Sequence, residues 1–540
     1  MRRETMVQQV RDRNAAGTPW DIAVIGGGAT GMGVAVDAAS RGLSVVLVEA
    51  HDFGKGTSSR STKLVHGGVR YLEQGNIPLV MSALKERGLM RQNAPHLVHD
   101  LAFVVPNYSW WEAPFYGIGL KLYDLLAGKY GFGASKLLSK EETLRRLPAL
   151  EPEALLGGVI YFDGQFDDAR LLIHLAMTAA DHGATLVNYC PATGLMRDAE
   201  GFVNGVLARD RETGEALTLP ARMVVNATGV FTDQVRQMAD PAADPLVVTS
   251  QGIHLVFDRS FLKAETALMV PRTSDGRVLF VIPWHGHAVA GTTDTPVDAP
   301  SLEPKALDEE IEFVLETAGR YLSRPPSRRD VLAVYVGLRP LVKGEGKTSA
   351  LSRDHVIHVD ASGLLTITGG KWTTYRHMAE DCIDHVITLG RLPDLPCATR
   401  NLRIHGYMEN AANLSSLEVY GTDAEAIQTL AADPVLAAQL YPEVPYIAAE
   451  VVWAARAEMA CTVEDVLARH TRALFLNARA AMAMAEPVAH LLATELGRDK
   501  AWVDAQVAEF ITLAQQYRVP SQNREQEARP KGGQDVGGAM

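Results

Sequence analysis

A short apolar run that leads into a glycine-rich turn constrains the fold of this chain more than any other feature. The run Ile22–Ile25 is typical of a buried parallel strand, and G-x-G-x-x-G follows at Gly26, Gly28 and Gly31. The first glycine permits a tight turn, the second lets the backbone approach a pyrophosphate, and the third lets helix and strand pack closely. The next helix would present free N–H groups to the phosphates. The pattern therefore predicts a dinucleotide-binding βαβ unit.

The residues after the glycines decide how much weight this pattern carries. With 46 glycines in 540 residues, the spacing arises by chance in roughly one such chain in three. Here a helical segment ends at Arg41-Gly42, and a second strand, Ser44–Val48, ends in Glu49. A carboxylate about 20 residues beyond the first glycine binds ribose hydroxyls in such folds. The alternative, a structural turn followed by an ordinary strand-end glutamate, fits this context less well.

The periodicity of the sequence divides the chain into a large α/β region and a smaller helical domain. Residues 1–20 are polar, and we expect a flexible arm. Strand and helix patterns alternate over 21–395. The domain 396–525 is expected to be helical, because residues from roughly 420 to 518 are rich in Ala, Leu, Glu and Arg at helical spacing. Within that domain Thr462-Val-Glu-Asp465 predicts a helix start. The Gly-rich tail, 526–540, is expected to be disordered.

The composition argues against several classes of protein. Lys and Arg total 52 and Asp and Glu total 64, and a net charge of −12 does not favour a nucleic-acid partner. Cys190, Cys382, Cys397 and Cys461 form no CxxC pair, so neither a metal site nor a dithiol redox motif is expected. The N-terminus lacks the apolar core of a secretory signal, and no stretch approaches ~18 uninterrupted apolar residues, so no membrane-spanning helix is predicted.

A longer motif after Glu49 carries a family resemblance. The segment Gly56-Thr-Ser-Ser-Arg-Ser-Thr-Lys-Leu-Val-His-Gly-Gly-Val-Arg-Tyr-Leu-Glu73 resembles the signature of FAD-dependent glycerol-3-phosphate dehydrogenases. Further matches are Val225-Asn-Ala-Thr-Gly229, Gly291-Thr-Thr-Asp294, Gly337-Leu-Arg-Pro340 and Gly369-Gly-Lys-Trp-Thr-Thr-Tyr-Arg376. Similarity to the mitochondrial-type branch is carried by Thr273-Ser-Asp-Gly-Arg-Val, Ile282-Pro-Trp284, Ala113-Pro-Phe-Tyr and Lys121-Leu-Tyr-Asp124. The resemblance runs from about residue 20 to 390 and extends into the helical domain.

The resemblance implies a fold and an activity. The fold would be an α/β FAD-binding, Rossmann-like fold of the D-amino-acid-oxidase or glutathione-reductase type, with a β-rich substrate domain and a C-terminal helical domain. FAD-binding parts would lie at roughly 21–75, 160–235 and 330–390, and substrate or cap parts at roughly 76–159 and 236–329. The activity would be oxidation of sn-glycerol 3-phosphate to dihydroxyacetone phosphate. No second G-x-G-x-x-G is found, so the substrate, rather than reduced nicotinamide, would reduce the flavin.

Two departures from the family pattern limit what is carried over. Val230 stands where the family often has proline after the Asn-Ala-Thr-Gly run. Related oxidases carry a lysine where this chain has Gln251, so no lysine role transfers to that position. The helical domain has no D-x-D-x-D-G loop, so calcium control is not implied.

Oxidation of an alcohol by a flavin needs a base for the hydroxyl proton and a site for the phosphate. The resemblance places His66 beside the flavin, and imidazole titrates near neutral pH. His66 is therefore the first candidate base and His254 the second, with a structural role as the alternative. Arginine binds phosphate bidentately, and Arg70 and Arg339 lie in matched motifs. Lys371 is a further candidate, for which a surface ion pair is the alternative.

The resemblance also assigns residues to the flavin site. The family places the stretch around residues 58–64 and the turn after the strand that ends at Asn226 beside the FAD, and Ala192 is a candidate for backing the adenine. Thr293 and Asp294 are candidates for lining the substrate pocket. The expected flavin-binding residues are Gly26, Gly28, Gly31, Glu49, Ser58, Ser61, Thr62, Leu64, Ala192, Ala227, Gly229, Gly370 and Thr373.

An aromatic and basic segment between Ala113 and Lys140 predicts membrane contact. Four lysines are interleaved with apolar residues against one acid, Asp124, and Trp110 and Trp111 precede the segment. Tryptophan favours the headgroup layer, and apolar burial with attraction to anionic lipid would hold such a segment in the interface. The alternative is a core helix with snorkelling lysines. The residues concerned are Phe115, Tyr116, Leu120, Leu122, Tyr123, Leu125, Leu126, Tyr130 and Phe132, with Lys121, Lys129, Lys136 and Lys140.

The resemblance favours the membrane interpretation. It implies a cytoplasmic enzyme, peripheral on the inner face of the cell membrane, that passes its electrons to a membrane quinone. The oligomeric state is left open, a homo-oligomer included. Rival interpretations are an oxidase that passes electrons to oxygen, a flavin amine oxidase, and a non-catalytic flavoprotein subunit.

Overall fold

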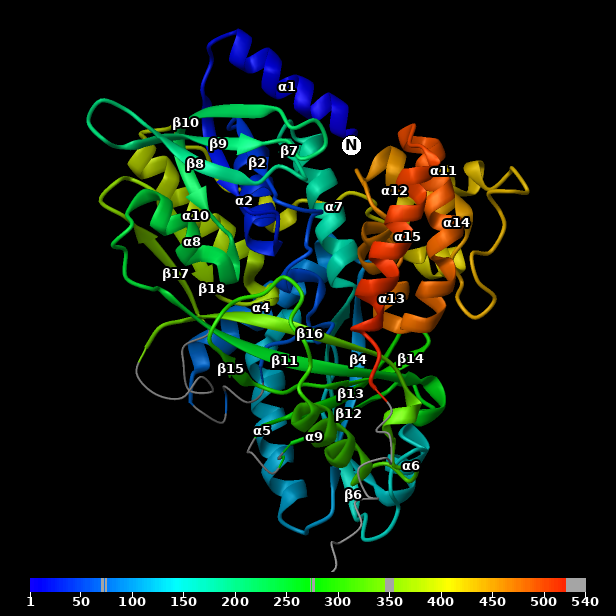
Figure 1. The fold of residues 1–540 in the computed structure, drawn as a ribbon. Helices are drawn as coiled ribbons and strands as arrows, with labels where there is room; N and C mark the ends of the chain where they lie inside the picture. The colour runs from blue at the N-terminus through cyan, green and yellow to red at the C-terminus, as the bar shows by residue number, and fades with distance from the viewer. Residues whose placement is uncertain (69–71, 73–74, 272, 274–276, 345–353, 521–540) are drawn as a thin grey trace, which may run out of the picture.

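Two mixed β-sheets and a group of C-terminal helices make up the protein (Figure 1). The computed structural model describes residues 1–68, 72, 75–271, 273, 277–344 and 354–520. The first sheet and its helices form the upper half of the molecule in Figure 1, and the second sheet lies below it. The C-terminal helices lie to one side, in orange and red. This architecture agrees with the α/β, Rossmann-like fold with a β-rich second domain and a C-terminal helical domain that the sequence predicts.

The first sheet is built around the predicted strand–turn–helix unit. Strands β1, β2, β7, β10 and β18 are parallel, and β17 is antiparallel to β18 at the edge. All four residues of β2 are buried, as expected of a strand covered on both faces. The order is β17 (His355–Val359), β18 (Leu365–Gly369), β10 (Ala216–Asn226), β1 (Trp20–Ile25), β2 (Val45–Val48) and β7 (Thr185–Val187).

Helices and a ribbon surround this sheet. Helix α2 (Ala29–Ser40) has Gly28 as its N-cap residue and packs against α10 (Tyr375–Gly390) and α7 (Asp168–Asp181). Strands β8 (Ala192–Arg197) and β9 (Val203–Arg209) continue antiparallel from β10. Helix α8 (Thr232–Ala239) follows the turn after β10.

The second sheet carries the candidate substrate residues. Its longest contact is the antiparallel pair β11–β16, in which Ser250 lies opposite Arg339 and His254 opposite Tyr335. The strands are β3 (Leu64–Val65), β4 (Val98–Asn107), β5 (Lys136–Ser139), β6 (Gly157–Phe166), β11 (Val247–Asp258), β12 (Ala267–Val270), β13 (Leu279–Trp284), β14 (His287–Gly291), β15 (Thr295–Val297) and β16 (Val331–Val342). Helices of this part are α4 (Ile77–Asn93), α5 (Glu112–Ala127), α6 (Lys140–Arg146) and α9 (Asp308–Gly319).

The C-terminal part is helical, as its composition predicts. Its helices are α11 (Ala424–Leu430), α12 (Ala448–Ala457), α13 (Ala473–Leu476), α14 (Ala478–Leu496) and α15 (Lys500–Gln515), with a π-helical turn over Asp465–His470. The predicted helix start is confirmed: the Asp465 N–H donates to Thr462 Oγ1 (3.2 Å), and the Thr462 N–H donates to Asp465 Oδ2 (2.9 Å). These two reciprocal bonds satisfy the first N–H groups of the helical turn.

The N-terminal residues correct one prediction. In place of a flexible arm over 1–20, residues Arg3–Ala15 form helix α1, which packs against β7 and β10. Met6, Val7 and Val10 are buried, and Arg3 pairs with Asp210 at 2.7 Å.

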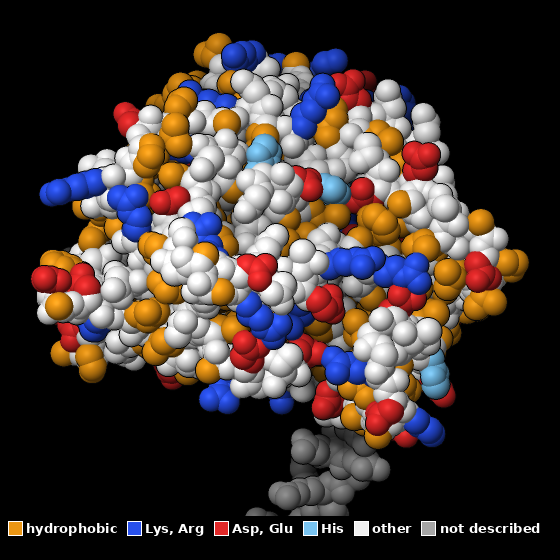
Figure 2. All heavy atoms as spheres, turned by 90° about the horizontal axis from the view of Figure 1, so that it is seen from above, with side chains coloured by type: hydrophobic (Ala, Val, Ile, Leu, Met, Phe, Trp, Pro, Cys, Tyr) orange, Lys and Arg blue, Asp and Glu red, His pale blue; other side chains and the backbone are white. Residues whose placement is uncertain are grey.

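Acidic and basic side chains are interspersed on the face seen from above in Figure 2. The tail predicted to be disordered, 526–540, lies outside the described residues.

Candidate active site

The glycine-rich turn forms one wall of a cavity of about 420 Å³. Gly26 has a φ of +109°, and a Cβ there would meet the Ala227 carbonyl oxygen at 2.7 Å. A Cβ at Gly31 would overlap the Gly26 carbonyl oxygen, so the third glycine sets the distance between strand and helix. A Cβ at Gly28 would meet only the Ser58 Oγ, at 3.1 Å. The backbone itself therefore forms the cradle that a dinucleotide pyrophosphate requires.

Glu49 closes this cradle at the end of β2. Its Oε2 accepts a hydrogen bond from the Gly27 N–H (2.6 Å), and its Oε1 accepts one from the His51 N–H (3.0 Å). Burial raises the pKa of the Glu49 carboxyl, although these backbone donors oppose the shift. The carboxylate is fixed at the rim of the cavity, where its remaining lone pairs can accept from ribose hydroxyls.

The predicted flavin residues fall into two groups. Those that line the cavity are Gly26, Gly28, Glu49, Ser58, Ala192, Ala227, Gly229 and Gly370. The others lie behind the lining and hold its parts. Ser61 donates to Asp168 (2.7 Å), Leu64 is buried in β3, and Thr373 accepts from the His66 N–H (3.3 Å). Thr62 contacts His254, and Gly31 packs closely against the carbonyl oxygen of Gly26. Direct flavin contact by this second group stays a prediction.

The two candidate bases differ in their surroundings. His66 is half-buried just after β3, and its backbone bonds to Thr373 anchor it to the segment that follows β18. His254 is buried in β11, and its ring stacks on Tyr335 with 4.7 Å between ring centroids. Burial, with the charges of Lys63 and Arg339, keeps the pKa of His254 well below its ordinary value. These surroundings favour the neutral form of the His254 imidazole.

The candidate phosphate ligands are fixed to different degrees. Arg339 in β16 donates to Thr292 Oγ1 (3.1 Å) and to the Thr293 carbonyl (3.0 Å), and it pairs with Asp294 at 3.4 Å. These contacts hold the planar guanidinium in one orientation, which bidentate binding of a phosphate requires. Lys371 lines the cavity. The other predicted ligand, Arg70, lies outside the described residues.

Strand alternation places His254 and Arg339 on one face. Residues 250, 252 and 254 of β11 share a face with 335, 337 and 339 of β16, because side chains in a sheet alternate with period two. A Cβ at Gly337 would meet the Arg60 carbonyl oxygen at 2.5 Å, so this face packs against the segment 57–63. That segment also borders the flavin cavity through Ser58. The candidate substrate residues therefore face a segment that also borders the cavity.

Sequence reasoning missed two residues within the matched motifs. Lys63 is fully buried, and its Nζ donates to Asp168 Oδ2 (2.7 Å) and to the Ser59 carbonyl (2.7 Å). Burial lowers the pKa of Lys63 to about 7, although Asp168 opposes the shift. Trp372 donates from Nε1 to the Ser58 carbonyl (2.8 Å) and lines the cavity. A lysine between Thr62 and Leu64 is expected at the surface, so no local sequence pattern indicates that Lys63 is buried.

The departure at Gln251 has a structural explanation. Its Nε2 donates to Glu310 Oε2 (2.7 Å), while Thr293 donates to the other oxygen of the same carboxylate (2.8 Å). Gln251 therefore serves as a buried neutral partner of Glu310. Val230, the second departure, lies in the cavity lining.

Comparisons with known proteins agree with this geometry. Residues 21–376 match the family model of FAD dependent oxidoreductases, and residues 365–503 match that of the C-terminal domain of alpha-glycerophosphate oxidase. The chain is 41% identical to a probable mitochondrial glycerol-3-phosphate dehydrogenase of Caenorhabditis elegans, over 92% of this chain and 73% of the relative. A mitochondrial glycerol-3-phosphate dehydrogenase of Arabidopsis thaliana is 40% identical, over 90% of this chain and 84% of the relative.

A solved structure gives the same result in three dimensions. The glycerol-3-phosphate dehydrogenase of Bacillus halodurans, complexed with FAD, superimposes with a TM-score of 0.76 at 30% identity, over 94% of this chain and 97% of that one. An L-alpha-glycerophosphate oxidase of Mycoplasma pneumoniae shares the fold, with a TM-score of 0.55 at 17% identity. The chain belongs to the family of FAD-dependent glycerol-3-phosphate dehydrogenases.

Proposed function

We propose that this protein oxidises sn-glycerol 3-phosphate to dihydroxyacetone phosphate and passes the electrons to a membrane quinone. The observation that carries the proposal is the shared face of β11 and β16, where a neutral His254 and a fixed Arg339 guanidinium face the segment bordering the flavin cavity. A phosphorylated alcohol suits this face, since the guanidinium can bind the phosphate while a histidine, His66 as the first candidate and His254 as the second, accepts the hydroxyl proton. An arginine guanidinium suits the amine substrate of a flavin amine oxidase less well, because both groups would be positively charged.

The residues of the chain have distinct tasks in this reaction. FAD, when bound, would supply the acceptor for a hydride from the substrate carbinol carbon. Arg339 holds the phosphate and so fixes the distance between the carbinol carbon and the flavin edge. His66 takes the hydroxyl proton, with His254 as the second candidate for this role. Glu49 and the backbone at Gly26–Gly31 hold the cofactor.

Anaerobic reduction tests the substrate assignment. Mixing the yellow holoenzyme with glycerol 3-phosphate should bleach the flavin absorbance within one turnover, whereas glycerol should leave it almost unchanged. Retention of the flavin colour with glycerol 3-phosphate, or equal bleaching by both alcohols, contradicts the assignment. Reoxidation by a soluble quinone that is much faster than by oxygen supports the quinone proposal. The opposite order favours the glycerol-3-phosphate oxidase alternative.

We further propose that the protein lies on the cytoplasmic face of the membrane through helix α5. Among the described residues, no helix is long and apolar enough to cross a bilayer. One face of α5 exposes apolar side chains, with Ile118 74%, Leu122 42% and Leu125 77% accessible, and Trp110 before it is 82% accessible. Lys121 and Lys129 are exposed beside them. Apolar surface flanked by lysines suits the interface of an anionic bilayer.

The structure divides the aromatic segment into two faces. Leu120 and Tyr123 are buried, and Leu126 packs against the cluster formed by Val80, Leu84 and Tyr123. Leu126 is therefore partly buried against this cluster and does not belong to the proposed membrane face. In Figure 1, α5 lies at the lower end of the molecule, away from α1.

Flotation with anionic liposomes tests the membrane proposal. The wild-type protein should float at low salt, and a variant with Ile118, Leu122 and Leu125 changed to serine should not. A matched control changes Phe202, Leu389 and Val435, which are also exposed apolar residues, to serine and should still float. The proposal fails if the wild type stays in the soluble fraction, or if both variants float equally.

A further inference from the structure

The loop that follows β2 contacts the glycine-rich turn from two sides. Gly27 donates its N–H to Glu49 Oε2 (2.6 Å), and it accepts a hydrogen bond at its carbonyl from the Gly54 N–H (3.1 Å). A Cβ at Gly27 would meet the Glu49 Cβ at 2.9 Å, so the two segments are in close contact. The position of residues 49–55 therefore determines the shape of the pyrophosphate and ribose end of the cavity.

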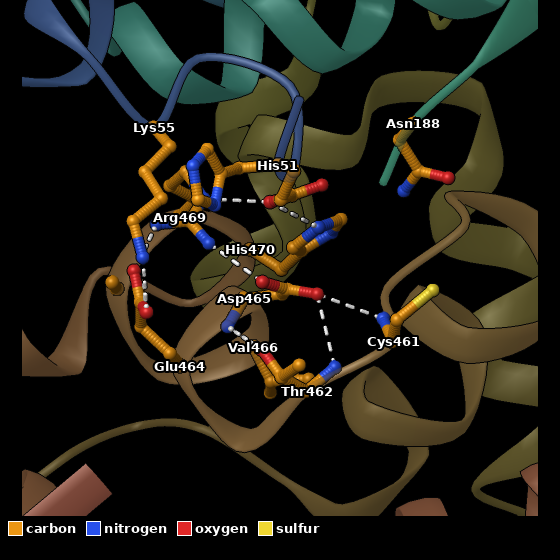
Figure 3. A network of polar contacts seen from close by, with 12 residues as sticks. His51, Lys55, Asn188, Cys461, Thr462, Glu464, Asp465, Val466, Arg469 and His470 are labelled. Atoms are coloured by element: carbon orange, nitrogen blue, oxygen red, sulfur yellow. Dashed lines mark hydrogen bonds and ion pairs between the residues drawn. The ribbon is translucent and has the colours of Figure 1, made fainter. Parts of the chain in front are cut away.

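A turn of the C-terminal helical part holds this loop (Figure 3). Arg469 donates from Nε to Asp52 Oδ2 at 2.6 Å, and both side chains are almost fully buried. The same guanidinium donates to Glu464 Oε1 (2.9 Å) and to Asp465 Oδ1 (2.7 Å), so three carboxylates fix its orientation. Glu464 in turn accepts from Lys55 Nζ (2.6 Å). The turn thus contacts the loop at both Asp52 and Lys55.

A third contact runs through Tyr189. The Tyr189 hydroxyl donates to Asp465 (2.7 Å to Oδ1), and the Tyr189 N–H donates to the His51 carbonyl (2.9 Å). Asp465 is itself fixed by the N–H groups of Cys461 (2.8 Å) and Thr462 (2.9 Å). Each link in this path is a directional hydrogen bond, so a shift of the turn would shift the backbone at His51.

The same part of the chain reaches a second segment of the flavin site. Arg472 donates to the Ser59 carbonyl (3.2 Å) and to Asp168 Oδ1 (2.7 Å). Ser59 adjoins Ser58, whose Oγ accepts from the Ala29 N–H (2.9 Å) at the start of α2. The two separate segments that approach the glycine-rich turn are therefore both held by residues 464–472.

We propose that residues 464–472 of the helical part are a positioning element of the flavin site. Through Arg469, Glu464 and Asp465 they fix the loop 49–55, and the loop fixes Gly27 and Glu49. A buried ion pair adds little net stability relative to apolar packing, but it defines one geometry. The function of these contacts is therefore retention of FAD, and none of Arg469, Glu464 and Asp465 lines the cavity.

The test measures FAD binding without substrate, so its result is independent of the proposed reaction. A double variant, Asp52→Asn with Arg469→Met, removes one negative and one positive charge of the cluster. Glu464 keeps Lys55 as its partner, and Asp465 keeps the Tyr189 hydroxyl and the N–H groups of Cys461 and Thr462. Free FAD fluorescence after dilution of the holoenzyme should give a Kd at least tenfold above wild type. The rise in Tm produced by added FAD should shrink accordingly, because ligand stabilisation depends on the Kd.

A matched control separates positioning from general destabilisation. Arg87 and Asp163 form a buried pair at 2.6 Å that does not border the flavin cavity. The variant Arg87→Met with Asp163→Asn should keep the FAD Kd within about twofold of wild type, even if its Tm falls. An FAD Kd in the Asp52/Arg469 variant that equals wild type, or that rises no more than in the control, overturns the proposal.

A milder variant covers the case in which the double variant does not fold. Glu464→Gln keeps the shape of the side chain but removes the charge between Lys55 and Arg469. The FAD Kd should rise about threefold or more, with a smaller effect on the Tm measured without added FAD. Equal FAD affinity in Glu464→Gln and wild type contradicts the proposed role.

Discussion

The Oγ1 atom of Thr62 lies 2.9 Å from the Nε2 atom of His254. The two residues belong to different parts of the chain, since Thr62 adjoins β3 and His254 lies in β11. This hydrogen bond, together with stacking on Tyr335, leaves the imidazole one orientation. It also determines which ring nitrogen is engaged, so the proton-accepting capacity of His254 depends on Thr62.

We predict that Thr62→Val reduces the rate of flavin reduction more than Thr62→Ser does. Valine keeps the shape of threonine but leaves His254 Nε2 without its hydroxyl partner, whereas serine retains the hydroxyl. Stopped-flow measurement of flavin reduction under anaerobic conditions compares the two variants. Equal rates in both would show that the hydroxyl has no part in the reaction.

Replacement of the first candidate base should have a large kinetic effect. His66→Ala should slow flavin reduction by roughly 10²–10⁴-fold, because a positioned base contributes on that scale. FAD content should stay close to wild type, which absorbance at the flavin band checks. Normal single-turnover reduction in this variant would transfer the role of base to His254.

Loss of the Arg339 guanidinium should mainly weaken substrate binding. Removing a charge-assisted contact costs about 1.5–3 kcal/mol, so Arg339→Ala should raise the Kd for glycerol 3-phosphate roughly tenfold or more. Glycerol has no phosphate, and its weak reactivity should change little. Arg339→Lys keeps the charge but loses the fork that Thr292 and Thr293 orient, so it should recover only part of the affinity. Equal losses for both alcohols would exclude phosphate binding by Arg339.

The parts of the site that the sequence predicts are those with local signals. Gly26 and Gly31 act through neighbouring backbone, so their spacing, together with the flanking strand and helix patterns, indicates the cradle. The pairing of Asp52 with Arg469 joins positions 417 residues apart, and no local pattern records it. The family resemblance indicates Arg339 as a phosphate ligand, which stays a prediction, and it could not indicate the ion pair of Arg339 with Asp294.

Helices α1 and α5 show that composition alone does not decide which of their residues are buried. In α1, Met6, Val7 and Val10 have the spacing of one helical face, a signal that the polar composition obscured. In α5, the composition indicated an amphipathic segment, but which leucines face outward depends on packing against α4. Leu126 therefore lies inside and Leu125 outside.

The glycine cradle gives a graded prediction for FAD binding. Gly31→Ala should abolish FAD binding, because the new Cβ would overlap the Gly26 carbonyl oxygen and separate helix α2 from its strand. Gly28→Ala should only weaken binding, since the nearest atom is the Ser58 hydroxyl oxygen at 3.1 Å. FAD content after purification and titration of added FAD measure both effects. Similar FAD content in the two variants would contradict the steric argument.

His470 gives a prediction for stability as a function of pH. Burial opposes its protonation, but Asp52 and Glu458 outweigh burial and raise its pKa to about 9 from an ordinary 6.5. Protonated His470 therefore stabilises the fold fully below pH 6.5, and the contribution is lost as the pH rises through 9. The contribution of Lys63 to stability changes in the opposite direction. Burial lowers its pKa from 10.5 to about 7, so Lys63 favours the folded state more as the pH rises above 7. The pH dependence of the Tm of the wild type therefore does not by itself test the contribution of His470, because the two contributions oppose each other.

The difference in Tm between wild type and His470→Gln isolates the histidine contribution, because Lys63 is common to both proteins. This difference should be largest at pH 6 and should shrink steadily up to pH 9.5, where neutral His470 no longer pairs with Glu458 (2.6 Å) as a cation. Thermal unfolding at constant ionic strength and with excess FAD provides the measurement. A difference that is constant with pH would show that His470 is neutral in the folded protein.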